Sequence, residues 1–558
     1  MSVKSKKKAA APLDGFFHYI DARGTFKGEI VAGISMGLLA VCGAFMNMQL
    51  VLQYSTADYF SANAAAIAAN GEVIAMTWIA AMLVSSIGTI VMGIVARRPF
   101  VQVAGMSLSC VLVSTMTINT GLTYYNMLAI VFVGDIAYLA IAAVPALRRL
   151  FVDALPRPVR LAIPAAAGIL MAYVAAQLSG VFIVAKRGVV SYGSQQMLGV
   201  GSAVLSGTPA LTSYGFLTDA YHPQMLMSAL AFALAVAAYL FCARKVKTSP
   251  FLTALMVGTL FFLVSCALLV GVVWRTMGFS LSYLWARLWM VGAEDALQAH
   301  FSTALANLQV GRIFSKGFDF SSFEEQGGNV ALAVASGTLN YLFLFLYDAQ
   351  STIDACDDIV KAEQPSSTLL PMLVNGATNI AASVLGVAPI ALGKESVAGT
   401  RDRGRSGLAA VVAGIIMLIS AFVWIVPALF CTLTSYSVQF NMYGHYGKVL
   451  QLLTMCSFTV VDAVMMVCGL MMAGRAIEEG ISGTVERAPF IATIAGTFLL
   501  SNLALGVACG MVCHVLVNLA KPTRKKGQPT AGLLERMGGV RPLIVTAVLA
   551  VVLFASIL

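Results

Sequence analysis

The sequence predicts an all-α polytopic membrane protein with about fourteen transmembrane spans. Hydrophobic residues make up 59% of the 558 positions and charged residues only 11%, whereas soluble domains carry about 25% charged residues. Apolar runs of about 17–25 residues recur from one end of the chain to the other, and each is long enough to cross a hydrocarbon core of about 30 Å. The mean hydropathy of +0.86 agrees with this class.

The apolar runs form two sets of seven. The first set lies at about 27–53, 73–96, 101–117, 123–146, 158–184, 223–243 and 250–275. The second lies at about 330–351, 369–387, 390–403, 407–433, 450–474, 489–501 and 504–520. Because an odd number of spans reverses the direction of the chain, two such sets predict a 7+7 inverted repeat, as in many secondary transporters.

Positive charge gathers in connections between the apolar runs. The basic stretches read KSKKK, ARRPF, RRLFVDALPRPVR, ARKVK, RDRGR and KPTRKK. Short basic connections are typical of cytoplasmic loops, so the net charge of +10 indicates orientation in the membrane and no nucleic-acid partner. We expect a multi-pass protein of the plasma membrane with its N-terminus in the cytoplasm.

Charge and hydropathy together divide the chain into five regions. These are a cytoplasmic basic N-terminus (1–26), a first seven-span repeat (27–275), an extracellular loop (276–329), a second seven-span repeat (330–520), and a cytoplasmic basic loop with a C-terminal apolar segment (521–558). The sequence leaves open whether the last apolar run, 541–558, is an extra or an interfacial helix.

The sequence lacks the motifs of enzymes and of metal or nucleotide sites. Ten cysteines and five histidines are scattered without metal-ligand spacing. No phosphate-binding glycine loop, dinucleotide fingerprint or zinc-protease helix occurs. We therefore expect neither an enzyme nor a bound cofactor. Coupling to an ion through carboxylates, with H⁺ as the expected ion, is the natural source of energy for transport.

The third span of each set is interrupted. In the first set VQVAGMSLSC (101–110) is short, and in the second GVAPIALGKESVAGTRDRGRSG (386–407) contains Gly386, Pro389, Gly393 and Gly399. Short, Gly/Pro-interrupted segments at corresponding places in two halves indicate a binding site at the middle of the membrane.

Carboxylates inside apolar spans are candidates for function, because a charge at the bilayer centre costs about 2.5–3.5 kcal/mol on insertion scales. Asp348 follows the run FLFLY, and on a helix Ser351 and Thr352 lie one turn further on the same face. With Gln350 they would offer a carboxylate, hydroxyls and an amide to one cavity. The alternative is a solvated Asp348 at the cytoplasmic end of its span.

Two further acids lie in predicted spans. Glu395 sits in the interrupted tenth span, and its side chain tends not to pair with Lys394 because neighbours in extended backbone point to opposite faces. Asp135, within FVGDIAYLAIA, is either a proton relay or an interhelical hydrogen-bond partner. Asp462 is interpreted as structural.

At these positions the sequence resembles the nucleobase:cation symporter family, in its azaguanine-resistance (AzgA-like) branch of purine permeases. That branch carries FDTAGT in span 8, where this chain has YDAQST (347–352), and IESAAG in span 10, where this chain has KESVAG (394–399). PGMGLNA in span 3 corresponds to AGMSLSC (104–110). The order of the motifs is the same over most of the chain.

The resemblance implies a fold with core and gate domains, in which spans 3 and 10 are each a short strand plus a half-helix. It implies elevator-type alternating access and a homodimer. The substrate-binding residues that it implies are Asp348, Glu395, Ser109, Gln350, Leu108, Gly393 and Ser351. Asp348 and Glu395 would hydrogen-bond a base and, with Asp135, are the candidates for proton coupling.

The sequence thus predicts a proton-coupled symporter of nucleobases, with hypoxanthine, adenine and guanine as expected substrates. This chain departs from the family at Ser109, where the family has Asn, and at Lys394, which is new. These changes leave open a pyrimidine such as uracil, or another planar heterocycle. A sulfate-permease-like anion transporter of the same architecture is the second alternative, and Lys394 is the feature that favours it.

Overall fold

The computed structural model describes residues 13–54, 71–105, 108–109, 122–178, 222–245, 249–269, 310–360, 367–422, 458–481, 486–500, 502–520 and 539–557. Several predicted features lie outside the described residues. They are the basic N-terminal stretch, residues 110–117 of the third span, most of both long outer connections, and the basic loop at 521–526.

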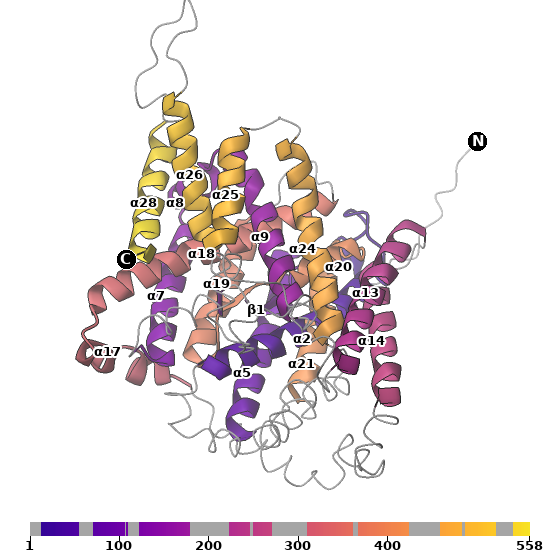
Figure 1. Ribbon diagram of the computed structural model, residues 1–558. Coiled ribbons are helices and arrows are strands. Elements are labelled where there is room, and N and C mark those ends of the chain that lie inside the picture. Colours follow the sequence, from indigo (N-terminus) through magenta and orange to yellow (C-terminus); the bar gives the residue numbers. More distant parts are fainter. Residues whose placement is uncertain are drawn as a thin grey trace, which may run out of the picture.

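The described residues fold into helices and two short strands (Figure 1). The first half contains α2 (Phe26–Tyr54), α5 (Gly71–Val91) continued by η1 (Met92–Ala96), β1 (Gln102–Ala104), α7 (Tyr124–Ala143), α9 (Arg157–Leu178), α13 (His222–Lys245) and α14 (Pro250–Leu269). The second contains α18 (Val330–Val360), α19 (Leu369–Val384), β2 (Ile390–Leu392), α20 (Glu395–Arg401), α21 (Gly407–Phe422), α24 (Phe458–Ile481), α25 (Arg487–Leu500) and α26 (Leu503–Ala520).

Shorter elements and one last helix complete the described chain. They are α1 (Asp14–Phe17), α8 (Pro145–Arg148), η2 (Arg149–Asp153), η5 (Ile313–Gly317), α17 (Ser321–Glu325) and α28 (Val540–Ile557). The last apolar run is therefore a helix, and α28 packs against α26 and α18.

The polytopic fold predicted from hydropathy is confirmed. Within the described residues, seven helices are long and apolar enough to cross a membrane, and six more apolar helices have 10–17 residues. Each predicted span corresponds to one of these helices or to a segment that holds a strand. The largest difference is α18, which was expected to end at 351 but continues to Val360. Asp348 consequently lies inside a helix and not at its solvated end.

The packing of the helices repeats between the two halves. The helices α2 and α5 of the first half pack on α21 of the second half. In the same way their equivalents, α18 and α19, pack on α7, which is the equivalent of α21. α13 contacts α24 as α25 contacts α9, and the hairpin of α13 and α14 corresponds to that of α25 and α26. α9 and α24, which occupy the same place in the two halves, pack on each other. The seven-plus-seven repeat is therefore visible in the contacts themselves.

Two bundles result from this packing. We call α2, α5, α7, α18, α19, α20 and α21 with both strands the core bundle, and α9, α13, α14, α24, α25 and α26 the gate bundle. Figure 1 shows β1 near the centre of the molecule, with α2, α5 and α21 on one side of it and α9 and α24 on another.

The two strands form one antiparallel ladder. Its pairs are Gln102 with Leu392, Val103 with Ala391, and Ala104 with Ile390. The ladder is extended at both ends, since Gly105 N donates to Pro389 O (2.9 Å) and Gly393 N donates to Val101 O (2.8 Å). Equivalent strands that run in opposite directions are what an inverted repeat requires.

Side chains of the neighbouring helices satisfy the outer edges of this ladder. On β1, Thr89 Oγ1 of α5 accepts from Gln102 N (2.9 Å) and donates to Gln102 O (3.2 Å). On β2, Asn379 Oδ1 of α19 accepts from Ile390 N (2.7 Å), and Thr352 Oγ1 of α18 donates to Leu392 O (3.1 Å). Strand backbone is tolerated at membrane depth only when its polar groups are satisfied within the protein.

Glycines allow α9 and α24 to approach closely. A Cβ at Gly469 would lie 2.9 Å from Ala172 N and would also collide with Gly168 O, and a Cβ at Gly168 would collide with Gly469 O. The two glycines occupy facing positions on equivalent helices. Small residues at helix interfaces are the usual device for close packing in membranes.

We predict that Gly469→Ala destabilises the protein, because the added methyl group meets backbone that cannot move aside. The expected loss is about 1–3 kcal/mol, the usual cost of overpacking, measured as a lower melting temperature in detergent. Gly474→Ala on the same helix is the matched control, since nothing lies within 4 Å of its Cβ position. Equal melting temperatures for both variants would contradict the close approach.

Candidate functional site

The candidate site lies where β2 passes into α20 and faces α18. Glu395 is the first residue of α20, and its side chain is buried with 4% of its surface exposed. Its carboxylate packs against the backbone of two glycines, Gly43 and Gly393. A side chain at either position would meet it, since an added Cβ at Gly43 would lie 2.8 Å from Oε1 and one at Gly393 would collide with Oε2. Gly393, predicted at the site, therefore leaves the space that the Glu395 carboxylate occupies.

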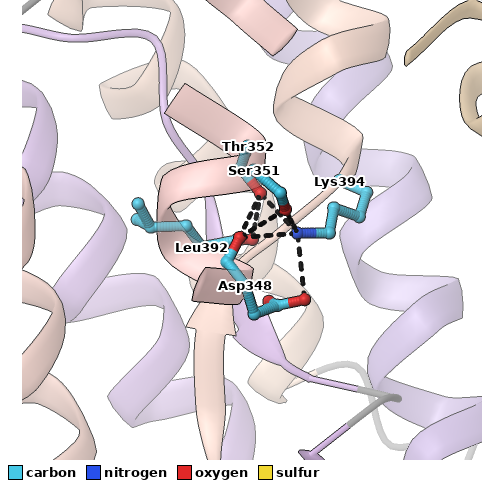
Figure 2. Close-up of polar contacts among 5 residues, drawn as sticks. All are labelled: Asp348, Ser351, Thr352, Leu392 and Lys394. Atoms are coloured by element: carbon cyan, nitrogen blue, oxygen red, sulfur yellow. Dashed lines mark hydrogen bonds and ion pairs between the residues drawn. The ribbon is translucent and has the colours of Figure 1, made fainter. Parts of the chain in front are cut away.

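Asp348 is buried on α18, with 3% of its surface exposed, and it faces Lys394 (Figure 2). The Nζ atom of Lys394 lies 3.1 Å from Asp348 Oδ1. The same ammonium donates to Asp348 O (2.9 Å), Ser351 Oγ (2.8 Å) and Thr352 Oγ1 (2.7 Å). One turn of α18 thus surrounds the Lys394 ammonium with oxygen atoms.

Ser351 and Thr352 share a helix face with Asp348, as predicted. The Ser351 hydroxyl donates to Asp348 O (2.6 Å), one turn earlier on the helix. Both side chains are completely buried. Ser351 and Thr352 contact the Lys394 ammonium, so the structure assigns these hydroxyls an internal partner.

Gln350 does not belong to this group. Its Nε2 donates to Asp354 Oδ1 (2.7 Å) on the next turn of α18. A residue two positions after Asp348 is rotated by about 200° around a helix, which accounts for the different direction. The amide nitrogen of Gln350 is therefore directed toward Asp354, and a role of Gln350 in substrate binding stays a prediction.

The segment after β1 contributes Leu108 and Ser109, which are both fully buried. Ser109 N donates to Gly105 O (2.9 Å), so a helical turn follows β1 as α20 follows β2. Ser109 Oγ has no hydrogen-bond partner among the described residues. This hydroxyl can therefore bond a ligand without breaking a bond to one of those residues.

Asp135 lies in a separate network between α7, α18 and α19. Its Oδ1 accepts from Tyr341 (3.1 Å) and from Asn379 Nδ2 (2.7 Å), and Ser383 Oγ lies 3.5 Å from Oδ2. Tyr341 precedes Asp348 by seven residues, or about 10 Å along the helix axis. Of the two interpretations of Asp135 from the sequence, the geometry favours the interhelical hydrogen-bond partner.

This network also fixes the strand β2 that leads to the site. Asn379 donates to Asp135 through Nδ2 and accepts from Ile390 N through Oδ1. It therefore joins the buried acid of α7 to the first residue of β2, three positions before Gly393. The backbone that leads to Glu395 is held by these neutral hydrogen-bond donors and acceptors.

Sequence reasoning missed two residues here. Lys394 was considered for pairing with Glu395 and as a mark of anion transport, but its partner is Asp348. The expectation of alternation along an extended strand does not apply here, since Lys394 has helical backbone angles and Glu395 begins α20. Asp402 was overlooked altogether. Its carboxylate accepts from Ser35 Oγ (2.9 Å) and from Phe251 N and Leu252 N (both 3.2 Å), and so caps α14 from the end of α20.

Buried carboxylates inside apolar spans are typical of substrate and proton pathways in membrane proteins. Comparison with known proteins agrees with such a pathway. No family model matches the chain. It is 22% identical over 519 residues to the guanine/hypoxanthine permease PbuG of Bacillus subtilis (strain 168), a match that covers 92% of this chain and 96% of that protein. The chain is a multi-pass membrane protein, and the protein that it resembles over nearly its whole length is a permease.

Solved structures give weaker similarities. The transmembrane domain of the cyanobacterial bicarbonate transporter BicA matches 87% of this chain and 96% of its own, with 13% identity and a TM-score of 0.42. SLC26A9 matches 89% of this chain and 66% of its own, with 13% identity and a TM-score of 0.47.

We predict that Asn379→Leu destabilises the protein, because it leaves Ile390 N without its partner and removes one of the two hydrogen bonds to Asp135 Oδ1. The expected loss is about 1–3 kcal/mol for each buried group left unsatisfied, measured by thermal unfolding in detergent. Asn375→Leu, one turn earlier on α19, is the matched control. Asn375 is also fully buried and lies near the Tyr138 hydroxyl, but within the described residues neither of its amide atoms has the distance and angles of a hydrogen bond. A larger loss for Asn375→Leu would contradict the role of Asn379.

Proposed function

We propose that the chain is a proton-coupled symporter that takes up nucleobases, most of all the purines hypoxanthine and guanine, and that it belongs to the AzgA-like branch. The full-length similarity to a guanine/hypoxanthine permease supports the substrate class. The observation that carries the proposal is the pair of buried acids, Asp348 and Glu395, held on facing elements beside the strand crossing.

The chemistry of a base fits such a site. An oxopurine edge presents ring N–H groups and a carbonyl, which match a carboxylate and the polar backbone where the strands end. Glu395 lies beside Gly393 and Gly43, so a flat ring can approach it without meeting a side chain from those positions. Ser109 Oγ is a further hydrogen-bonding group on the opposite strand segment.

Protonation of a buried carboxylate couples the base to H⁺. Ionised Glu395 is a buried negative charge, and burying a charge costs free energy. A proton, or an N–H group of the base, offsets that cost. Asp135 remains a candidate for coupling by position in the membrane, but the network around it supports a structural role. Adenine, uracil and other planar heterocycles are the alternative substrates. Uptake measured with a panel of these compounds distinguishes them from hypoxanthine and guanine.

Alternating access in this fold would move the core bundle against the gate bundle. Asp402 joins the two, because it follows α20 of the core bundle and caps α14 of the gate bundle. An elevator movement therefore has to break this cap. We further propose a location in the plasma membrane with a cytoplasmic N-terminus, and a homodimer as the assembly.

Anion transport of the sulfate-permease type is less well supported. Lys394 is the feature that favoured it, and its ammonium already has oxygen partners from Asp348, Ser351 and Thr352. Lys394 and Asp348 together carry no net charge, and the Glu395 carboxylate, when ionised, repels an anion.

We predict that cells or liposomes containing the protein take up radiolabelled hypoxanthine faster at acidic than at alkaline external pH. Glu395→Gln should lower uptake by about 10–100-fold, the value of a hydrogen bond to a charged group, and should remove its pH dependence. Glu324→Gln, at an exposed position of α17, is the control. Guanine, adenine, uracil and sulfate as competitors define the specificity, and the absence of uptake of any base would refute the proposal.

A further inference from the structure

Lys394 makes an unusually complete set of contacts for a buried lysine. Its ammonium has three hydrogens, and four oxygen atoms lie between 2.7 and 3.1 Å from it. All four belong to one turn of α18, while Lys394 itself stands between β2 and α20. The contacts therefore join the element that carries Glu395 to the helix that carries Asp348.

The hydroxyl groups are oriented to receive this cation. The Ser351 hydroxyl donates to Asp348 O (2.6 Å), and the Thr352 hydroxyl donates to Leu392 O (3.1 Å). Because each hydroxyl has one hydrogen, their lone pairs remain for the ammonium. Figure 2 shows both oxygen atoms beside Lys394 Nζ, on the side of the ammonium away from the Asp348 carboxylate.

The charges of the pair cancel in a buried place. The side chains of Lys394 and Asp348 are 12% and 5% exposed, respectively. Removing one partner of a buried ion pair leaves the other charge uncompensated, which is far worse than removing both. The pair is thus one neutral unit, whereas Glu395 has no lysine or arginine within ion-pair distance among the described residues.

Other groups that can titrate or carry charge surround the pair. Glu395 at the start of α20 and Tyr138 of α7 are close enough to Asp348 to interact with it electrostatically. The Lys394 ammonium is also near enough to Glu395 to act on it electrostatically, and the thiols of Cys356 on α18 and Cys468 on α24 lie near Lys394 and Glu395, respectively. Of these groups Glu395 is the only carboxylic acid besides Asp348.

We propose that Lys394 is a tethered counter-ion that keeps Asp348 ionised throughout transport, so that Glu395 alone carries the coupling proton. This inference rests on the proposed function and adds an assignment of roles to the two acids. Lys394 is a positioning residue: it fixes the charge of Asp348 and holds the β2–α20 junction against α18. Asp348 then presents a permanent acceptor, and the proton enters and leaves at Glu395.

The test uses the full-length protein in liposomes and initial rates of hypoxanthine uptake over a range of external pH. Lys394→Met and Asp348→Asn should each lower uptake at neutral pH by roughly tenfold or more, because each leaves a buried charge unpaired. The double variant should regain the melting temperature that each single variant loses, since no buried charge is left unpaired. Its uptake stays low because the Asp348 acceptor is missing, but the remaining uptake should keep the pH dependence of the unmodified protein, since Glu395 is unchanged. Lys27→Met, at an exposed position of α2, is the control for loss of a positive charge.

Acidic pH distinguishes the two single variants. Lys394→Met should recover uptake as pH falls, because a proton on Asp348 restores neutrality. Asp348→Asn should not recover, since the lysine keeps its charge. A purely structural contact would give no such difference.

Each other outcome counts against the inference. If Lys394→Met keeps the rate and pH dependence of the unmodified protein, Lys394 is not a counter-ion. If the double variant is folded by size-exclusion chromatography but its melting temperature is no higher than those of the single variants, the two residues do not act as a pair. If the unmodified protein transports no base, the proposed function itself fails, and the assignment of roles fails with it.

Discussion

The antiparallel pairing of β1 with β2 is the constraint on which the rest of the structure depends. Three residues of each strand lie extended within a bundle of apolar helices. Each unpaired backbone N–H or C=O there would cost several kcal/mol. The strands satisfy one another on the inner edge, and Thr89, Asn379 and Thr352 satisfy the outer edges. The neighbouring helices are therefore fixed in rotation and height by the polar side chains that they supply.

The buried carboxylates around this crossing are stabilised in different ways. Asp135 receives hydrogen bonds from neutral side chains, and Asp402 receives them from a helix N-terminus and a serine. Asp348 has an ammonium. Glu395 is held close to glycine backbone, and Lys394, the cation that acts on it electrostatically, forms its ion pair with Asp348 instead. A change in its protonation state therefore disturbs the fewest interactions, which suits an acid that exchanges a proton during each transport cycle.

Hydropathy was sufficient to predict the spans, because twenty apolar residues have few alternatives to a membrane helix. The interrupted third and tenth spans were also predictable, since Gly386, Pro389 and Gly393 do not suit a continuous helix. The pairing of the strands with each other, however, joins residues that are nearly 300 positions apart. The partner of Lys394 likewise lies on another element, and only the packing of α18 against β2 defines it.

The same distinction applies to the individual site residues. Asp348, Ser351 and Thr352 are one turn apart, so helical periodicity placed them on one face correctly. The direction of the Gln350 amide nitrogen toward Asp354 did not follow from residue types alone, since it depends on the rotation of the helix. Asp135 could not be assigned from the sequence, since its role depends on Tyr341 and Asn379, which come from helices more than 200 positions away.

A structure of the full-length protein with hypoxanthine bound tests the central claim most directly. The account predicts the base between α18 and the strand crossing, with a ring N–H donating to Glu395 and the Lys394–Asp348 contact intact. A base bound elsewhere, or one that displaces Lys394 from Asp348 and leaves Glu395 without contact, would contradict it.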